Sequence, residues 1–306
     1  MEKGNKMIKI NSSKVFDIVN YVILTVLMLI FLYPIYFTVI ASFSEPYDVV
    51  SGEVVLWFKG FTIESYKQVF KTKEIWVGYR NSIVYTVVGT LFAMFMTMPA
   101  AYAMSKKKLW GRGIFSTFFL ITMYFGGGLL PTYLLIKNMG LLNQPYTQIV
   151  LGAFSVYNMI VARTYFQSSI PESLYEAAEI DGCSQIKQFF MIALPLAKPI
   201  IAVLTLYYAV GRWNDFMTSL IYVSKTQYYS LQHVLRMILI QNANALSGID
   251  ASAMEATEVE YLLRKQYMAE AMKYSVILIA SLPMLIIYPF VQKHFVKGVM
   301  IGALKG

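Results

Sequence analysis

The chain has 306 residues, of which 57% are hydrophobic and only 14% are charged, and its formal net charge is +9. A soluble domain carries about 25% charged residues, so this composition excludes a water-soluble globule and predicts a membrane protein. The positive charge does not indicate nucleic-acid binding, because the basic residues flank apolar runs instead of forming one stripe.

Few residues suit covalent or metal chemistry. Cys183 is the one cysteine, so no intrachain disulfide can form, and we expect it to be a small buried side chain, not a reactive thiol. His233 and His294 lie far apart without neighbouring Cys or His, which argues against a metal site. The sequence contains neither G-x-S-x-G nor H-E-x-x-H, so we predict no catalytic, cofactor-binding or metal-binding residues.

Four lysines in residues 1–17 precede an apolar run at 18–41. This run is longer than the core of a secretory signal, which spans about 7–15 residues. It therefore predicts an uncleaved first membrane span that follows a cytoplasmic tail.

Six apolar runs approach or exceed the length of about 20 residues that crosses a bilayer as a helix. The predicted fold is an all-α membrane protein with six transmembrane helices and a structured cytoplasmic loop. The predicted spans are 18–41, 82–104, 114–136, 149–166, 199–222 and 274–291. The corresponding divisions are a tail at 1–17, the first span and an outer loop at 18–80, a core at 81–291 with a loop at 168–198, and a tail at 292–306.

Lysine and arginine placement predicts the orientation of these spans. The tail at 1–17, the short loop at 105–113 and the tail at 292–306 are all basic, whereas the short loop at 138–148 lacks Lys and Arg. Both termini are therefore predicted to be cytoplasmic, and the segments 42–80 and 223–273 to be outside. Those two outer segments contain helix patterns, and they either dock an external partner or cap the bundle.

Several spans contain helix breakers, including the glycine run 126–128, and polar residues. The breakers fit ordinary kinks or helices that line a pathway. The candidate pathway-lining residues are Asn158, Trp213, Asn214 and Asp215. Polar groups inside a membrane are costly and often functional; Asp215 fits either helix–helix bonding or a pathway.

The loop at 168–198 is polar and helix-prone between two apolar runs. Ser169-Ile170-Pro171-Glu172 matches a capping box, and the helix after it would place Leu174, Ala177 and Ala178 on one face. Gly182 permits a sharp turn, and a second short helix is predicted at 184–192. The acidic residues of this predicted helix–turn–helix are expected to pair with basic residues of a partner.

The spacing Glu176-Ala177-Ala178, Gly182 and Ile192-Ala193-Leu194-Pro195 matches the EAA motif of ABC importer permeases. The chain resembles this binding-protein-dependent family over essentially its whole length. Residues 61–70, 213–215 and 297–306 are similar to MalG-type carbohydrate permeases. Residues 125–133 resemble the LplC/YtcP-like subgroup, which is associated with oligosaccharides and complex saccharides.

The resemblance implies a type I importer with a MetI-like transmembrane domain and a cytoplasmic coupling helix, in a bacterial cell membrane. Its partners would be a second homologous permease chain, two ATPase subunits, an extracytoplasmic sugar-binding protein, a saccharide and the lipid bilayer. The residues implied to dock the ATPase are Glu176, Ala177, Ala178, Asp181, Gly182, Ile192, Leu194 and Pro195. Gly302, Lys305 and Gly306 of the tail would also reach the ATPases.

The chain lacks a G-x-x-x-x-G-K-[ST] sequence, so we expect no ATP or other cofactor on it, with ATP and Mg²⁺ bound by the partner ATPase. The predicted function is that of a non-catalytic permease subunit for carbohydrate import. The alternative is a secondary carrier driven by an ion gradient. Such a carrier is typically marked by paired intramembrane carboxylates and an inverted repeat.

Overall fold

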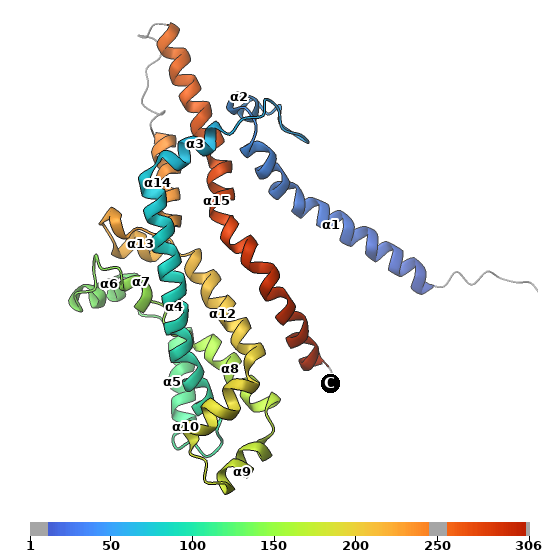
Figure 1. Cartoon of the computed structure of the whole chain (residues 1–306), viewed down its shortest axis with the longest axis vertical. Coiled ribbons are helices and arrows are strands. Elements are labelled where there is room, and N and C mark those ends of the chain that lie inside the picture. Colours follow the sequence, from blue (N-terminus) through green and yellow to red (C-terminus); the bar gives the residue numbers. More distant parts are fainter. Residues whose placement is uncertain (1–11, 245–255, 304–306) are drawn as a thin grey trace, which may run out of the picture. The chain divides into compact units, whose positions relative to one another are not determined.

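The computed structural model describes residues 12–244 and 256–303, and every regular element in those ranges is a helix (Figure 1). The all-α prediction is confirmed. Two compact units make up the chain. Unit 1 contains Met1–Lys71 and Asn242–Ile279, and unit 2 contains Thr72–Gln241 and Ala280–Gly306.

Unit 1 is built on the first apolar helix. It contains α1 (Ser12–Ser42), α2 (Pro46–Val50), α3 (Glu64–Lys71) and the first part of α15 (Ala256–Ala303). The end of α1 packs its Ile40 and Ala41 against Val49 and Val54 of the following segment. Tyr66 of α3 donates a hydrogen bond to Ser42 at 2.8 Å, so the connection after α1 turns back onto the end of that helix.

Unit 2 is arranged around α4 (Lys73–Ser105), which packs against α7, α8 and α12. The other helices are α5 (Arg112–Tyr124), α6 (Leu129–Asn138), α7 (Thr147–Val150), α8 (Val156–Ser169), α9 (Glu172–Ile180), α10 (Gln185–Gln188), a π-helix (Phe189–Ala193), α11 (Leu194–Leu196), α12 (Lys198–Trp213), α13 (Met217–Tyr222), a 3₁₀ turn (Thr226–Tyr228) and α14 (Leu231–Asn244).

Small residues on α4 explain its central position. Its buried positions include Gly78, Ser82, Gly89, Ala93 and Ala101. These positions are spaced by four, seven, four and eight residues, which places them along one side of the helix. Small side chains let neighbouring backbones approach closely, as is common between helices in membranes.

Tyr208 of α12 ties three elements of unit 2 together. Its hydroxyl lies 2.7 Å from the hydroxyl of Thr97 on α4, and it accepts a hydrogen bond at 3.1 Å from the backbone N–H of Ser155, the residue before α8. The hydroxyl and backbone groups are thereby satisfied by neighbouring helices, as the hydrocarbon interior requires.

Three described helices are long and apolar enough to cross a membrane, at Phe16–Ser42, Lys73–Ser105 and Glu260–Ile286. Two bent pairs raise this number to five if each pair is one span. One is α5 with α6, bent by 111°, and the other is Gln185–Leu196 with α12, bent by 82°. The first, second and sixth predicted spans therefore correspond to continuous helices.

The remaining predicted spans are interrupted. The run 114–136 breaks at the glycines before α6, where Gly128 has φ +83°, which suits glycine. The run 149–166 contains a turn at Gly152 (φ +72°), and α8 has only 14 residues. The run 199–222 divides between α12 and α13. Hydropathy reports apolar length but not these local breaks.

Candidate docking site at the EAA loop

The EAA loop, residues 168–198, forms a helix–turn–helix at the end of unit 2 where α4 terminates (Figure 1). Gly182 has φ +73° and donates its N–H to Glu179 at 3.1 Å, while Cys183 donates to Ala178 at 2.8 Å. These two bonds define a Schellman motif. The sharp turn predicted at Gly182 is present because glycine adopts positive φ without a steric cost.

The first helix of the loop begins differently from the sequence prediction. Helix α9 starts at Glu172 with Pro171 as its N-cap, and no side chain caps it. Ser169 belongs to the end of α8, so the predicted capping box is wrong. The second helix is capped as its sequence suggests, because the Ser184 hydroxyl accepts the N–H of Lys187.

Aromatic residues bury the inner face of α9. Tyr175 and Ala178 are its buried residues, and the Tyr175 ring lies 6.0 Å from that of Tyr102 on α4. Phe166 and Phe189 pack against Tyr102 at 5.8 and 5.1 Å. The predicted face of Leu174, Ala177 and Ala178 is divided in the structure: Leu174 and Ala177 are exposed, whereas Ala178 turns inward with Tyr175.

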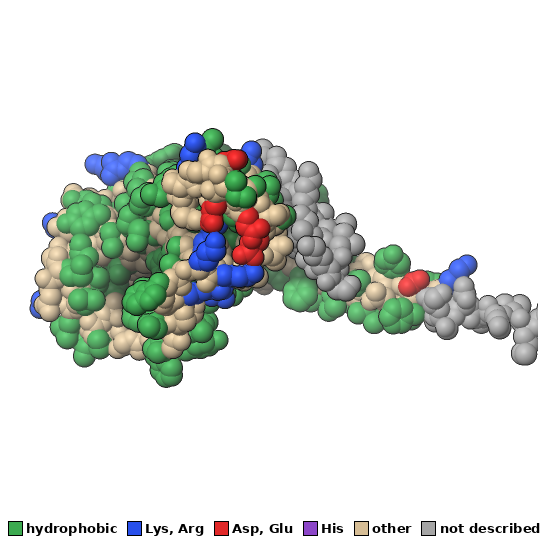
Figure 2. All heavy atoms as spheres, turned by 90° about the horizontal axis from the view of Figure 1, so that it is seen from below, with side chains coloured by type: hydrophobic (Ala, Val, Ile, Leu, Met, Phe, Trp, Pro, Cys, Tyr) green, Lys and Arg blue, Asp and Glu red, His purple; other side chains and the backbone are tan. Residues whose placement is uncertain are grey.

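The basic loop, residues 106–111, is tied to α9 by two ion pairs. Lys107 Nζ lies 2.6 Å from a Glu172 carboxylate oxygen, and Lys108 Nζ lies 3.2 Å from one of Glu179. Gln185 also donates to Glu179 at 2.9 Å. Figure 2 shows basic and acidic side chains next to one another at this end of unit 2.

These ion pairs change the expected role of the acidic residues. Glu172 and Glu179 bind lysines of their own chain, whereas the prediction assigned them to a partner. In the sequence, Lys107 and Lys108 indicated only the orientation of the spans. The sequence did contain a signal for these ion pairs. The two glutamates are seven residues apart and therefore share one face of a helix, and a run of lysines is available to pair with them.

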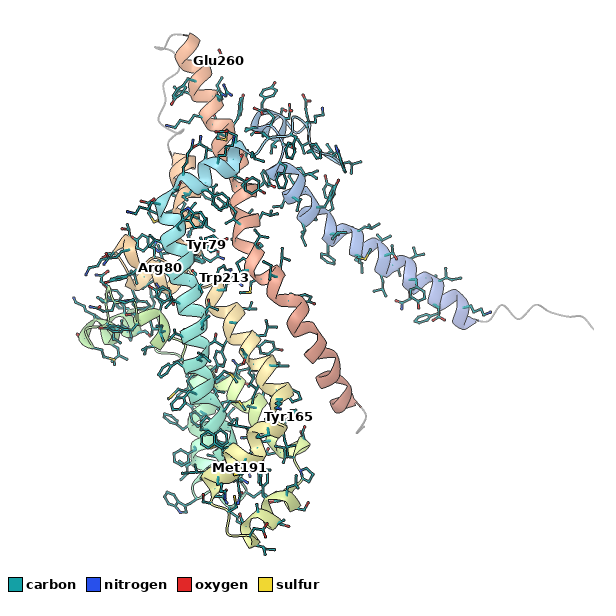
Figure 3. All side chains as sticks on the ribbon, viewed as in Figure 1. Tyr79, Arg80, Tyr165, Met191, Trp213 and Glu260 are labelled. Atoms are coloured by element: carbon teal, nitrogen blue, oxygen red, sulfur yellow. The ribbon has the colours of Figure 1, made fainter. Side chains whose placement is uncertain are left out.

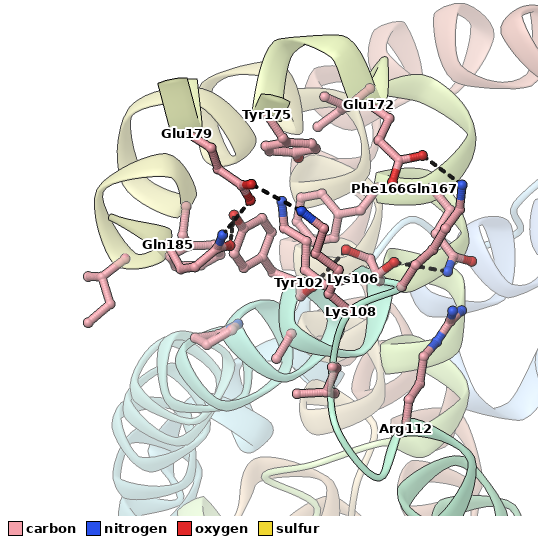
Figure 4. Close-up of a pocket in the computed structure, with 18 of the residues that line it drawn as sticks. Tyr102, Lys106, Lys108, Arg112, Phe166, Gln167, Glu172, Tyr175, Glu179 and Gln185 are labelled. Atoms are coloured by element: carbon pink, nitrogen blue, oxygen red, sulfur yellow. Dashed lines mark hydrogen bonds and ion pairs between the residues drawn. The ribbon is translucent and has the colours of Figure 1, made fainter. Parts of the chain in front are cut away.

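Lys106 occupies the gap between the two ion pairs (Figure 4). Its ammonium lies 3.1 Å from the centroid of the Tyr175 ring and 4.7 Å from that of Tyr102. Burial lowers the pKa of Lys106 and raises the pKa of Tyr175 to about 12. A cation over an aromatic face is attracted by the ring's quadrupole, so this contact holds the basic loop against α9.

A cavity of about 900 Å³ lies between the basic loop, α9 and the end of α4. Tyr102, Phe166 and Phe189 line its apolar side, and Lys106 and Glu176 line its polar side. Gln188 is fully buried nearby and donates to the Cys183 carbonyl at 3.1 Å. The side of the EAA loop that faces α4 is thus fixed by packing and hydrogen bonds.

The EAA loop continues into α12 through a π-helix at Phe189–Ala193 and the bend of 82°. Pro195 lacks the N–H that would bond to Met191 in an α-helix, and Pro199 lies in the first turn of α12, where its missing N–H is tolerated. Ala197 and Ile201 still donate to Ala193 and Ala197 at 2.9 and 3.0 Å. The bend is therefore a hydrogen-bonded junction.

The predicted docking residues fall into two groups. Glu176, Ala177, Asp181, Gly182 and Pro195 are exposed. The others shape the loop from within, because Ala178 is buried and Ile192 and Leu194 pack partly buried against the core. Exposed apolar side chains absent from the prediction lie beside the first group: Ile180 (88% exposed), Ile186 (73%) and Phe190 (61%).

The candidate pathway-lining residues have structural contacts. Trp213 is buried, donates its indole N–H to the Ala280 carbonyl at 2.9 Å, and lies 6.1 Å from the Tyr79 ring (Figure 3). Asp215 accepts a hydrogen bond at 3.1 Å from the N–H of Thr218 in the first turn of α13. Asn214 is the exposed C-cap of α12, and Asn158 is buried on α8. A pathway role stays a prediction for all four.

The predicted tail contacts lie at the limit of the structure. Gly302 is in the last turn of α15, whereas Lys305 and Gly306 fall outside the described residues. Their placement at an ATPase interface remains a prediction.

Acidification is expected to release the basic loop from α9. Ion pairing with Lys107 and Lys108 lowers the pKa of Glu172 and Glu179. The ion pairs that lower these pKa values stabilise the contact between the basic loop and α9 at pH values above the ordinary carboxyl pKa of 4.5. This stabilisation is lost as the pH falls through the lowered pKa of the two glutamates. Spin labels at positions 110 and 173, in a Cys183→Ser chain, should move apart in that range.

The lysines provide the control for this acid-induced opening. With Lys107→Gln and Lys108→Gln, the label distance at neutral pH should exceed that in the parent chain and should no longer change on acidification, because the carboxylates have lost their charged partners. A label distance in the parent chain that stays constant through acidification would contradict the two ion pairs as the fastening of the basic loop.

The fold and the site together define an integral membrane protein with an exposed helix–turn–helix joined to its bundle. Residues 75–301 match the family described as binding-protein-dependent transport system inner membrane component. The chain belongs to this family of transport permeases.

Individual relatives cover almost the whole chain. It is 37% identical to protein LplC of Bacillus subtilis, over 100% of both chains. It is 35% identical to the polygalacturonan/rhamnogalacturonan transport system permease protein YtcP of the same species, over 96% of this chain and 99% of that one. A crystal structure of a bacterial ABC transporter involved in the import of the acidic polysaccharide alginate matches with a TM-score of 0.81 and 31% identity, covering 96% of this chain and 100% of that chain.

Proposed function

We propose that this chain is the permease subunit of an ABC importer that moves an oligosaccharide or complex saccharide into a bacterial cell. The family membership supports a transport role. The cargo class is supported by the relatives, which include YtcP and a galactooligosaccharides permease protein, GanQ of Bacillus subtilis, at 28% identity over 94% of this chain.

The observation that carries this proposal is the two-sided construction of the EAA loop. Its inner face is held by Tyr175, by Tyr102 of α4 and by two ion pairs. Its outer face presents Glu176, Ala177 and Ile180 to the surroundings. The EAA loop, with its fixed inner face and its exposed, partly apolar outer face, suits a partner protein that applies force to it. The interface between them would have a buried apolar centre, and such interfaces resist separation.

In the proposed mechanism, the EAA loop is the point at which the ATPase subunits attach to the permease. Separate ATPase subunits, which bind ATP and Mg²⁺, receive the exposed face of the EAA loop. Closure of an ATPase pair would displace α9, and the hydrogen-bonded junction at Ala197 would pass that displacement to α12. Since this chain supplies one such loop, a second homologous permease chain and a second ATPase subunit would complete the transporter.

The same proposal places an extracytoplasmic binding protein and both chain termini. The binding protein would deliver the saccharide, and both termini would lie in the cytoplasm, where the tail from Gly302 onward reaches the ATPases. The chain itself would carry no catalytic step, because hydrolysis takes place on the partner subunits.

Cross-linking tests the docking assignment. In a Cys183→Ser chain, Ile180→Cys should cross-link to an ATPase subunit in the assembled transporter, because Ile180 is 88% exposed on α9. The matched control is Met139→Cys at the end of α6, which is also exposed and should give no ATPase adduct. Uptake should also stop when the ATPase gene is deleted.

Two results would overturn the proposal. An Ile180→Cys chain that never captures an ATPase subunit would remove the docking role of the EAA loop. Undiminished uptake in cells without the ATPase would instead support a carrier driven by an ion gradient.

A further inference from the structure

The connection between α2 and α3 exposes a run of large apolar side chains. Val55, Leu56 and Trp57 are 52%, 69% and 66% exposed, although they lie in a loop. Their neighbours Val54 and Phe58 turn inward and pack in the core of unit 1. The exposed run is therefore a protruding tip held by two anchored residues, and it needs an apolar environment.

This tip loop, residues 53–59, is closed at a charged base. Lys59 Nζ lies 2.7 Å from a Glu53 carboxylate oxygen, and the Glu45 N–H donates to the Lys59 carbonyl at 2.9 Å. The Lys59 N–H in turn donates to the Ser44 hydroxyl at 3.2 Å. Charge is thus confined to the base, while the tip between Glu53 and Lys59 carries only apolar side chains.

The tip lies beside α1 and not beyond its end. The Tyr33 hydroxyl donates to the Val55 carbonyl at 3.2 Å, and the Tyr36 hydroxyl donates to the Leu56 carbonyl. Helix α1 ends at Ser42, so Tyr36 and Tyr33 lie about 9 and about 13.5 Å back along its axis at about 1.5 Å per residue. Both belong to the stretch Phe16–Ser42, which is apolar enough to span a membrane.

We propose that the tip loop is a membrane anchor that dips into the lipid bilayer next to α1, with Leu56 and Trp57 at the boundary between headgroups and acyl chains. Apolar side chains of α1 are exposed along the same part of that helix, for example Ile35 at 62%. Tryptophan favours this boundary, and interfacial segments bury their apolar side about 5–10 Å deep.

The tyrosine hydrogen bonds fit this location. Backbone carbonyls that leave water must be bonded within the protein, and Tyr33 and Tyr36 bond the carbonyls of Val55 and Leu56. The charged base remains at the level of the headgroups, because Glu53 and Lys59 are both about half exposed. Charge at the base and apolar residues at the tip match the polarity gradient of a bilayer surface.

Depth-dependent quenching of Trp57 tests the anchor. Trp76, Trp110 and Trp213 are replaced by phenylalanine, and the full chain is reconstituted into bilayers both alone and within the assembled transporter. Phosphatidylcholine brominated near the top of its acyl chains should remove most of the Trp57 emission in both preparations. Acrylamide, which is confined to water, should quench Trp57 far less than it quenches free tryptophan.

A charge at the tip provides the matched variant. Leu56→Glu keeps the backbone carbonyl that bonds Tyr36, so the loop should fold unchanged, but bromolipid quenching of Trp57 should fall and acrylamide quenching should rise. Strong acrylamide quenching in the parent chain would show a tip in water and overturn the proposal. Protection of Trp57 from both quenchers that occurs only in the assembled transporter would also overturn the proposal, because it would show that the tip docks on another protein chain.

Discussion

Replacing Gly182 with proline is expected to abolish substrate uptake while the chain still inserts into the membrane. Gly182 has φ +73° and donates its N–H to Glu179. Proline fixes φ near −65° and has no N–H, so the Schellman turn cannot form and α9 loses its orientation toward the ATPase. The apolar spans lie elsewhere in the chain, so membrane insertion is unaffected. Uptake by cells and the amount of chain in membranes are the two measurements.

Substitutions that differ only in tolerance of positive φ provide the controls. Asparagine adopts the left-handed conformation more readily than other non-glycine residues, so Gly182→Asn should retain most uptake. Alanine costs about 1–2 kcal/mol there, and no atom lies within 4 Å of its β-carbon, so Gly182→Ala should be intermediate. Equal uptake by the proline and asparagine chains would remove the turn from the coupling path.

Replacing Gly89 with alanine is expected to lower the free energy of unfolding by about 3 kcal/mol, the cost of disturbing buried hydrogen bonds to a charged group. A β-carbon at Gly89 would lie 2.5 Å from Arg212 Nη1. Arg212 cannot easily yield, because its guanidinium donates to the carbonyls of Gln148 and Ile149 at 2.7 and 3.1 Å. Thermal unfolding in detergent measures the loss.

A double-mutant cycle isolates this contact. In an Arg212→Ala chain the space beside Gly89 is free, so Gly89→Ala should cost nothing there. Gly211→Ala is the matched single control, because Gly211 lies in α12 with no atom near its β-carbon and alanine is the better helix former. An equal loss from Gly89→Ala in both backgrounds would refute the steric account.

Local sequence signals predicted the EAA loop well where one residue decides the geometry. The turn at Gly182 follows from glycine's tolerance of positive φ, and the second short helix begins beside Ser184 as predicted. The inner face of α9 was not predicted, because it depends on Tyr175 facing Tyr102 of α4, which is far away in the sequence. Helical periodicity alone does not specify which side has an aromatic partner.

The charged residues likewise show what local sequence predicts and what depends on contacts between distant segments. The lysines of the basic loop predicted orientation through their number, which is a property of composition. Their pairing with Glu172 and Glu179 depends on how the end of α4 approaches α9. The guanidinium of Arg212 on α12 fills the space beside Gly89 of α4, which is another contact between segments that are distant in the chain.

By itself, the sequence determined that the chain is an all-helical membrane protein, where its long apolar helices lie, and which segment carries the EAA motif. These properties follow from apolar length, glycine and proline positions and residue spacing, all of which act within one segment. Only the tertiary structure decided that the EAA loop has a fixed inner face and a free outer one, and that the tip loop lies along α1. Such contacts join residues that are distant in the chain. Their energies depend on how the fold brings the two segments together, which no local sequence pattern specifies.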